Sequence, residues 1–167
     1  MSTRSLIAIK NDNTYTSVYC HFDGYPEGVG ITLLENYKSK KKMDDLLALG
    51  NISSLSKSIK KPEGHTFDKP QKGYTVFYGR DRGETDINAR KHESLQKLIE
   101  HLKESWCEYL YIFLPEENKF IFSKISIPEV FRDLKLHLKG FQNGRYHIAG
   151  INLYTLDENG KLTVKSM

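Results

Sequence analysis

The sequence has no hydrophobic run near the roughly 20 residues that a membrane-spanning helix needs. No hydrophobic segment follows the first residues, as a signal peptide would require. There are only two cysteines, Cys20 and Cys107, and neither belongs to a CxxC pair or to a Cys/His cluster. These absences argue against a disulfide framework and a structural zinc site. We therefore expect a reducing, cytoplasmic setting, with no metal and no cofactor.

A strong charge of one sign is also missing. The 25 lysines and arginines exceed the 21 aspartates and glutamates by only four, and residues 35–72, with nine lysines and five acids, hold that whole excess. A charge of this size does not by itself indicate a nucleic-acid-binding protein. The basic patch comprises Lys38, Lys40, Lys41, Lys42, Lys57, Lys60 and Lys61. These lysines can contact a nucleic-acid backbone, although a solvated helix and loop face is the commoner explanation.

The chain does contain enough apolar and aromatic material for a packed core. The apolar set makes up 38% of the 167 residues, and ten tyrosines and eight phenylalanines argue against disorder. A chain of this length suits one ordinary domain. We expect residues 1–167 to form a single globular domain.

Alternating polar and apolar residues predict several short strands joined as hairpins. The expected strands span residues 5–10, 15–22, 74–78, 109–114, 119–125, 148–156 and 161–164. Helices are expected over residues 29–37, from about residue 43 to Gly50, from Ser94 to about Glu104, and from Pro128 to about Leu138, and Asn51 is expected to cap one further turn. Hairpins outnumber helical crossovers, so we predict an α+β fold. It would have a mainly antiparallel sheet with about four helices packed on it, as a single pair of layers.

The first polar cluster follows the second strand and spans residues 19–26, with the sequence YCHFDGYP. His21 can act as a general acid or base, because an ordinary histidine pKa is about 6.5. Asp23 can orient His21 or bind a cation, and Tyr25 lies in the same loop. The alternative is a hairpin end with Asp-Gly turn chemistry and a histidine held by a hydrogen bond. Free N–H groups at the next helix attract anions, but Asp23 and Glu27 repel phosphate.

The second polar cluster is Arg80-Asp81-Arg82-Gly83-Glu84, which we expect to form a loop beyond a strand end. A guanidinium group can donate two parallel hydrogen bonds to one carboxylate or phosphate. Arg80 and Arg82 could therefore clamp a phosphate or an acidic partner, with Glu84 beside them. The alternative is internal pairing of the arginines with Asp81, Glu84 and Asp86.

Residues 60–73, which include two prolines and two glycines, should be the least structured part of the chain. His65, Phe67 and Asp68 lie in this loop, which could close over a site; a surface loop with Phe67 packed down is the simpler interpretation. Nucleophiles are not evident, because Cys20 and Cys107 lie in apolar strand-like runs and no serine lies in a nucleophile elbow.

Several of these segments resemble an uncharacterised family of small proteins found in bacteriophages, prophages and bacterial mobile elements. The resemblance rests on the start MSTRS and on the motifs at residues 19–26, 51–55, 65–67 and 78–84. It covers about residues 1–115, with Phe22 where the family pattern has Trp. The resemblance implies a phage-type accessory protein in the cytoplasm of a host cell, and no particular reaction. Such proteins often disarm host defence by binding a defence nuclease or sequestering a nucleotide signal.

Three functional hypotheses follow. The first is a non-catalytic, anti-CRISPR-like inhibitor that binds a host defence protein, its nucleic acid or a nucleotide. The second is a small phosphoesterase-type hydrolase with His21 and Asp23 as its catalytic pair and Arg80 and Arg82 as its phosphate clamp. The third is a structural or assembly protein. The candidate ligand- or partner-binding residues are His21, Asp23, Tyr25, His65, Arg80, Arg82 and Glu84.

Overall fold

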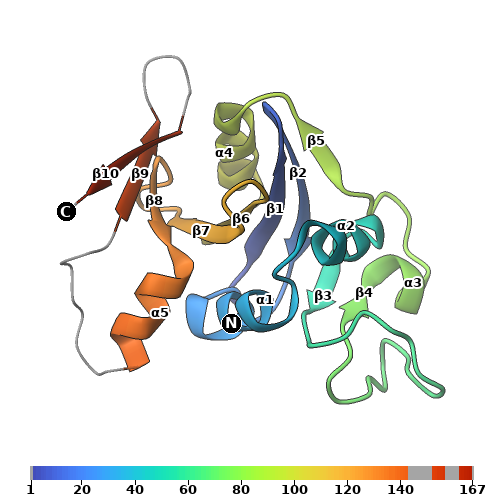
Figure 1. The fold of residues 1–167 in the computed structure, drawn as a ribbon. Coiled ribbons are helices and arrows are strands. Elements are labelled where there is room, and N and C mark those ends of the chain that lie inside the picture. The colour runs from blue at the N-terminus through green and yellow to red at the C-terminus, as the bar shows by residue number, and fades with distance from the viewer. Residues whose placement is uncertain (1, 143–151, 157–161, 167) are drawn as a thin grey trace.

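The computed structural model describes residues 2–142, 152–156 and 162–166. Ten strands form one sheet in the order β10-β9-β8-β7-β6-β1-β2-β3-β4, and β5 pairs with the free part of β2 (Figure 1). The strands are β1 (Ser5–Asn11), β2 (Thr14–Cys20), β3 (Ile52–Ser54), β4 (Val76–Phe77), β5 (Arg90–His92), β6 (Tyr109–Leu114), β7 (Lys119–Lys124), β8 (Val130–Asp133), β9 (Asn152–Leu156) and β10 (Leu162–Ser166).

Five α-helices and one π-helical turn accompany the sheet. They are η1 (Pro26–Gly30), α1 (Ile31–Asn36), α2 (Lys40–Ala48), α3 (Tyr78–Arg82), α4 (Leu95–Glu104) and α5 (Leu134–Gln142). Ser94 caps α4 as expected, because its hydroxyl accepts a hydrogen bond from the Lys97 N–H at 3.1 Å. No helix among the described residues combines the length and the apolar character that crossing a membrane requires.

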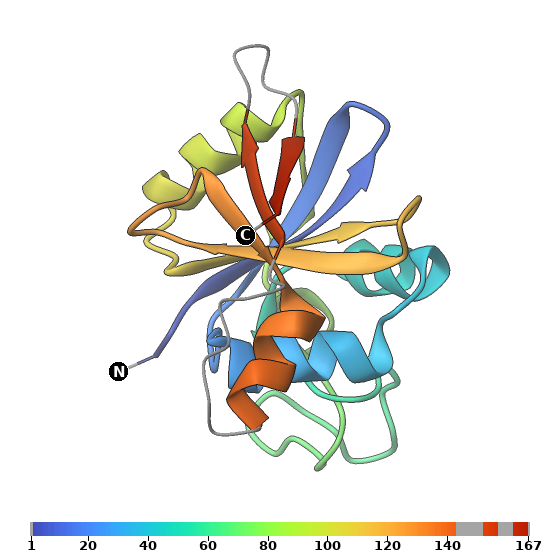
Figure 2. The ribbon, with the colours of Figure 1, turned by 60° about the vertical axis from the view of Figure 1, so that its left-hand side comes forward.

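The predicted α+β class is confirmed, and seven of the nine strand pairs are antiparallel. The hairpins β1–β2 and β6–β7 are present, and so is β9–β10, although residues 148–151 and 157–161 of that prediction lie outside the described part. The two parallel pairs are β1–β6 and β2–β3. The strongly twisted strands fan out in Figure 2.

The core has two parts, one on each face of the sheet. On one face, η1, α1, α2 and α5 cover a cluster that includes Leu33, Met43 and Phe113. On the other face, α4 alone covers a cluster that includes Leu6, Leu98 and Ile112. Figure 2 shows α4 on the opposite side of the sheet from α1 and α2.

Four local predictions are wrong. The turn expected after Asn51 is instead β3, and the loop expected at residues 79–84 begins with α3. The helix expected from Pro128 is a strand, β8, followed by α5, which continues through Gly140. The strand β5 was not expected at all, because its three residues are polar and acquire strand geometry only by pairing with β2.

Candidate functional site

Strand β3 brings the two predicted polar clusters to neighbouring positions. It runs parallel to β2, and this pairing continues past the end of β2, where the N–H groups of His21 and Phe22 donate to the carbonyls of Ile52 and Ser53 at 3.0 and 3.1 Å. Strand β4 pairs with the other edge of β3 and leads directly into α3 at Tyr78. The 19–26 and 78–84 segments therefore follow β2 and β4, the two strands that flank β3.

His21 is oriented by Tyr19. Its Nδ1 lies 2.7 Å from the Tyr19 hydroxyl, and its ring packs edge-on against Phe22 at 4.5 Å between centroids. Partial burial and the nearby positive charge of Arg4 lower the pKa of His21, so its ring is neutral at pH 7. Burial raises the pKa of Tyr19 to about 12, which keeps its hydroxyl protonated as a hydrogen-bond donor.

Asp23 and Tyr25 form a separate exposed pair. The Tyr25 hydroxyl donates to the Asp23 carboxylate at 3.1 Å, and Asp23 has a left-handed backbone with φ of 56°. The Asp23 carbonyl accepts the N–H of Val29 at 2.8 Å, and a Cβ at Gly28 would come within 2.4 Å of this carbonyl. Glycine is therefore required at position 28, and Asp23 closes the loop into η1. The residue in contact with His21 is Tyr19, rather than Asp23.

Arg80 is engaged inside the protein. Its guanidinium donates to both carboxylate oxygens of Asp81, to the Thr75 carbonyl at 3.2 Å and to the Ile59 carbonyl. The Asp81 side chain is fully buried and also accepts the Phe77 N–H at 2.8 Å. Burial alone would raise the pKa of Asp81, but the hydrogen bonds from Arg80 and Phe77 and the positive charge of Arg80 lower it. The arrangement corresponds to internal pairing of Arg80 with Asp81.

His65 belongs to the same buried cluster. Its Nδ1 accepts the Gln71 N–H at 3.0 Å, and its Nε2 lies 3.5 Å from Asp81. Since Nδ1 is an acceptor, Nε2 carries the proton and faces the carboxylate. Asp81 thus ties residues 59–75 to α3, and the segment expected to be the least structured is held by specific hydrogen bonds.

Arg82 and Glu84 point outward, in contrast to Arg80. The Arg82 guanidinium lies over the Phe67 ring at 4.7 Å, and that ring lies 5.7 Å from Tyr78. Gly83 ends α3 in the left-handed conformation with φ of 76°. Glu84 is exposed, and its N–H donates to the Tyr78 carbonyl at 3.1 Å. Phe67 is half-buried, and it supports Arg82 at the surface.

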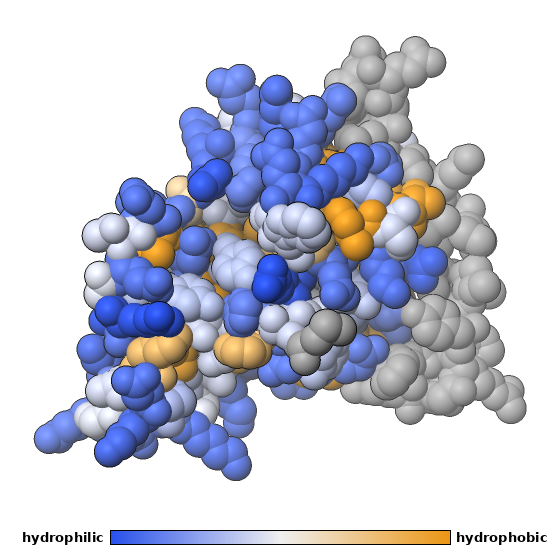
Figure 3. Space-filling model, turned by 180° about the vertical axis from the view of Figure 1, so that it is seen from behind, coloured by the Kyte–Doolittle hydropathy of each residue, from blue (hydrophilic) through white to orange (hydrophobic). Residues whose placement is uncertain are grey.

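These contacts form two aromatic groups, Tyr19 with His21 and Phe22, and Phe67 with Tyr78 and Arg82. We call the two groups together the aromatic face, and Tyr19 packs against the core cluster that α4 covers. Burial raises the pKa of Tyr78, and the charge of an ionised Tyr78 contributes to the raised pKa of Tyr19. Phe22 is 44% exposed. Seen from behind (Figure 3), the middle of the molecule carries weakly polar and hydrophobic side chains, with hydrophilic side chains above them and at the lower left.

A polar hollow of about 190 Å³ adjoins the aromatic face at Tyr19. Its other lining residues are Ser17, Asn51, Arg90, His101 and Ser105. Asn51 is fixed because its Oδ1 accepts the Tyr19 N–H at 3.0 Å. Arg90 is exposed and supplies a positive charge at the edge of the hollow. A guanidinium with amide and hydroxyl groups around it suits an anionic ligand.

His101, in the lining of this hollow, packs against a second histidine, His92. The rings of His92 and His101 are 5.1 Å apart, and the His92 Nε2 is 2.9 Å from the buried Ser17 hydroxyl. Burial, with the positive charges of His101 and Arg90, lowers the pKa of His92 to about 4, and burial lowers that of His101 as well. Both rings are neutral at pH 7. Among the described residues no group of three His, Cys, Asp or Glu side chains is arranged to hold a metal ion.

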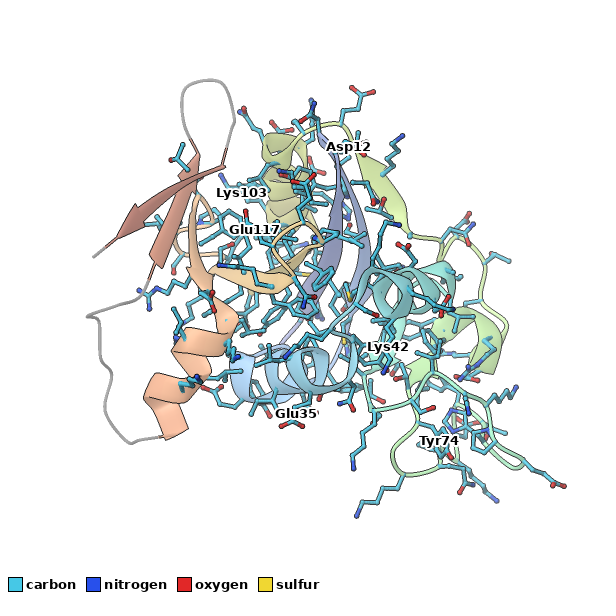
Figure 4. The ribbon with its side chains drawn as sticks, viewed as in Figure 1. Asp12, Glu35, Lys42, Tyr74, Lys103 and Glu117 are labelled. Atoms are coloured by element: carbon cyan, nitrogen blue, oxygen red, sulfur yellow. The ribbon has the colours of Figure 1, made fainter. Side chains whose placement is uncertain are left out.

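The basic patch does not form one free positive surface. Lys40 and Lys41 pair with Asp44 and Asp45 at 2.7 and 2.9 Å, each one turn further along α2. Lys61 lies 3.9 Å from Asp81. Figure 4 shows Lys42 on α2 and Tyr74 in the separate segment below it. Lys38 and Lys60 are exposed on the connections that follow α1 and β3.

Sequence reasoning missed Ser17, Tyr19, Asn51, Arg90 and His101 as site residues. Three of them left a signal, because strand alternation places Ser17 and Tyr19 on the same face as His21. His101 lies three residues after Leu98 in α4, beside the apolar stripe, so helical spacing alone places it at the edge of the covered face. The others are brought together by the pairing of β2 with β3 and β5, which sequence alone does not give.

Comparisons with models of known families, with curated proteins and with solved structures find no match to this chain.

Proposed function

We propose that this chain is a phage-type accessory protein that works by binding, and that its aromatic face holds nucleotide units of a single-stranded nucleic acid or of a free nucleotide. The family resemblance of the 19–26 and 78–84 motifs supports the accessory role. The geometry of the aromatic face supports the class of ligand.

The observation that carries the proposal is the combination of open aromatic rings with an arginine and a polar hollow. Bases stack on aromatic rings in a sequence-tolerant way, and each stacked base contributes about 1–3 kcal/mol. Phe67, Tyr78 and Phe22 supply rings at the surface. Arg82 and Arg90 supply charge for phosphate, and the hollow beside Tyr19 supplies hydroxyl and amide groups.

Binding is favoured over phosphoester hydrolysis by the partners of the proposed catalytic groups. A histidine base needs an orienting acid, and the group that contacts His21 is the neutral Tyr19 hydroxyl. A phosphate clamp needs free donors, and Arg80 already donates to Asp81 and to two backbone carbonyls. Arg82 is left to contact a phosphate, which suits recognition more than catalysis.

In this proposal the protein acts in the host cytoplasm and limits a defence system by occupying its nucleic acid or its nucleotide signal. A defence protein is the alternative partner, and the experiment below separates the two. The arginine and the rings then set selectivity, while the small net positive charge of the whole chain assists approach.

The test is fluorescence anisotropy with a labelled single-stranded dT12, an AMP competitor and a dT12·dA12 duplex. We expect the single strand to bind and the duplex to bind at least tenfold more weakly, because paired bases cannot stack on the rings. Phe67→Ala and Arg82→Ala should each weaken binding by roughly tenfold. Lys41→Ala, which removes one positive charge from α2, is the matched control and should change binding less than twofold.

Phage plating on defence-positive hosts provides the functional readout. Wild-type protein should raise plating efficiency, and Arg82→Ala should lose this benefit. The proposed ligand is wrong if neither dT12 nor AMP binds, or if Lys41→Ala weakens binding as much as Arg82→Ala does. A plating benefit without nucleotide binding would identify a protein partner instead.

A further inference from the structure

The opposite face of the sheet carries a cavity of about 460 Å³. Strands β6, β7 and β8 form its floor, and η1 and α5 form walls, with Pro26 and His137 among the lining residues. Figure 1 shows α5 and the start of α1 on this side, away from α4. A volume of this size lies within the roughly 300–1,000 Å³ typical of small-molecule sites.

Two aromatic rings lie in the floor of the cavity, whose lining is polar and apolar in about equal parts. Tyr109 and Phe122 line it, and both stack on the buried Tyr111, at 6.4 and 6.0 Å between ring centroids. Val130 and Ile127 extend the apolar surface. These rings are fixed by the register of β6 with β7. The floor therefore suits a planar apolar group that stacks on aromatic side chains.

Positive groups surround this floor. The Lys124 ammonium lies 5.6 Å from the centre of the Tyr109 ring, and Arg132 is the cross-strand neighbour of Phe122. The His137 ring packs edge-on against Phe122 at 4.9 Å. Glu27 is the one acidic residue in the lining, so Lys124 and Arg132 leave a net positive charge there.

Neither of these two cations is neutralised within the described part of the chain. No carboxylate there lies within ion-pair distance of Lys124 or Arg132, whereas Lys119 on the same hairpin pairs with Asp133 at 3.6 Å. A lysine and an arginine that flank an apolar floor without acidic partners favour an anion on the ligand.

We propose that this cavity is a second binding site, which takes a small molecule with one planar aromatic ring and one anionic group. The ring lies over Tyr109 and Phe122, and the phosphate or carboxylate reaches Arg132 and Lys124. The site is on the opposite side of the sheet from the aromatic face and does not depend on the function proposed above.

Calorimetric titration with phenyl phosphate and with benzoate tests the proposal and distinguishes the two anions. Inorganic phosphate and phenol are the half-ligands, with only the anion or only the ring. We expect at least one aromatic anion to bind, and both half-ligands to bind at least tenfold more weakly, because each loses either the stacking or the charge-assisted hydrogen bonds.

Variants then locate the binding site. Arg132→Gln should weaken binding by roughly tenfold, the usual scale for loss of a charge-assisted bond. Val130→Phe, which fills the cavity with a larger apolar side chain, should also reduce binding. Lys97→Gln, on the exposed side of α4, removes the same charge elsewhere and should have no effect. Thermal unfolding of each variant confirms that it is folded.

Two results would overturn the proposal. One is binding of inorganic phosphate as tight as that of phenyl phosphate, which would mean simple charge attraction. The other is aromatic-anion binding that Arg82→Ala abolishes and Arg132→Gln leaves intact. That result would place the ligand on the aromatic face, so it would count against this site while supporting the proposed function.

Discussion

Two arginines only two residues apart in α3 have opposite environments. Arg80 is 20% exposed in its side chain and donates to Asp81 and to the carbonyls of Ile59 and Thr75. Arg82 is exposed and lies over Phe67 at the surface. The same residue type in one short motif therefore serves folding at one position and is available for binding at the other.

The difference arises from the direction in which each side chain leaves the helix. Position 80 faces residues 59–75, and its guanidinium donates to the Ile59 and Thr75 carbonyls as well as to the buried Asp81. Position 82 is at the last turn before Gly83 and faces solvent. A polar motif in a sequence is thus not by itself a binding site, because buried carboxylates also recruit arginine.

The largest expected effect is on the free energy of unfolding, which should depend on Arg80 much more than on Arg82. Arg80→Ala leaves the buried Asp81 carboxylate without its main partner, which typically costs about 3–5 kcal/mol, whereas Arg82→Ala should cost below about 0.5 kcal/mol. For a chain of this size the first change corresponds to a fall in melting temperature of roughly 6–20 °C. Thermal and urea unfolding measure both variants, and equal losses would contradict the contrast.

The next effect concerns the buried histidines beside the polar hollow. The pKa of His92 is about 4 in the folded protein, against about 6.5 for an ordinary histidine. The unfolded chain therefore binds a proton that the folded chain resists, so stability is complete above about pH 6.5 and falls as pH drops towards 4. Over that pH range, protonation of His92 should lower the free energy of unfolding by about 3 kcal/mol.

Urea unfolding at several pH values between 7.5 and 4.5 checks this expectation. His92→Gln should flatten the dependence of unfolding free energy on pH, while His101 contributes a remaining slope of the same sign. His21→Gln is the control, because His21 is less buried. An unchanged slope in His92→Gln would show that the ring is already accessible to protons.

A smaller effect is expected on the affinity for dT12, which should depend on Arg82 more than on Arg80. In the dT12 titration, Arg82→Ala should weaken binding by about 1–2 kcal/mol through loss of a cation beside Phe67. Binding by Arg80→Ala, measured at a temperature where it remains folded, should stay within twofold of wild type. A larger loss for Arg80→Ala would mean that its charge reaches the ligand.

The smallest effect tests the basic patch. Lys40 and Asp44 form an exposed ion pair one helical turn apart, for which about 0.3–0.5 kcal/mol is typical. Lys40→Ala should therefore change the unfolding free energy by less than about 0.5 kcal/mol. Urea unfolding at low and high salt measures it, and a substantial loss that persists in high salt would give the patch a structural role.

Local patterns were sufficient for much of the fold. The apolar and aromatic runs on either side of the turn at residues 115–118 indicated β6 and β7, and Ser94 and Gly50 marked a helix start and a helix end because their cap roles are local. The short strands β3 and β5 depend on partners far away in sequence, whereas β4 lies within the strand expected over residues 74–78. The helix expected from Pro128 failed because Val130 and Phe131 pair with β9.

The site was only partly visible for the same reason. His21 and Arg82 stood out by residue type, and the structure places both on one face. The partner of His21 was assigned by sequence spacing to Asp23, but the alternation of β2 places Tyr19 on the same side as His21. The burial of Asp81 depends on His65, sixteen residues earlier, and no local pattern encodes that contact.

The most direct test of the central claim is an NMR titration of the labelled protein with dT4, in which the ring signals of His21, Tyr19 and Phe67 are followed. The proposal predicts that the largest shifts occur on these rings and near Arg82, with small shifts at His65 and at the lysines of α2. Shifts confined to Lys40, Lys41 and Lys42, with the ring signals unchanged, would contradict it.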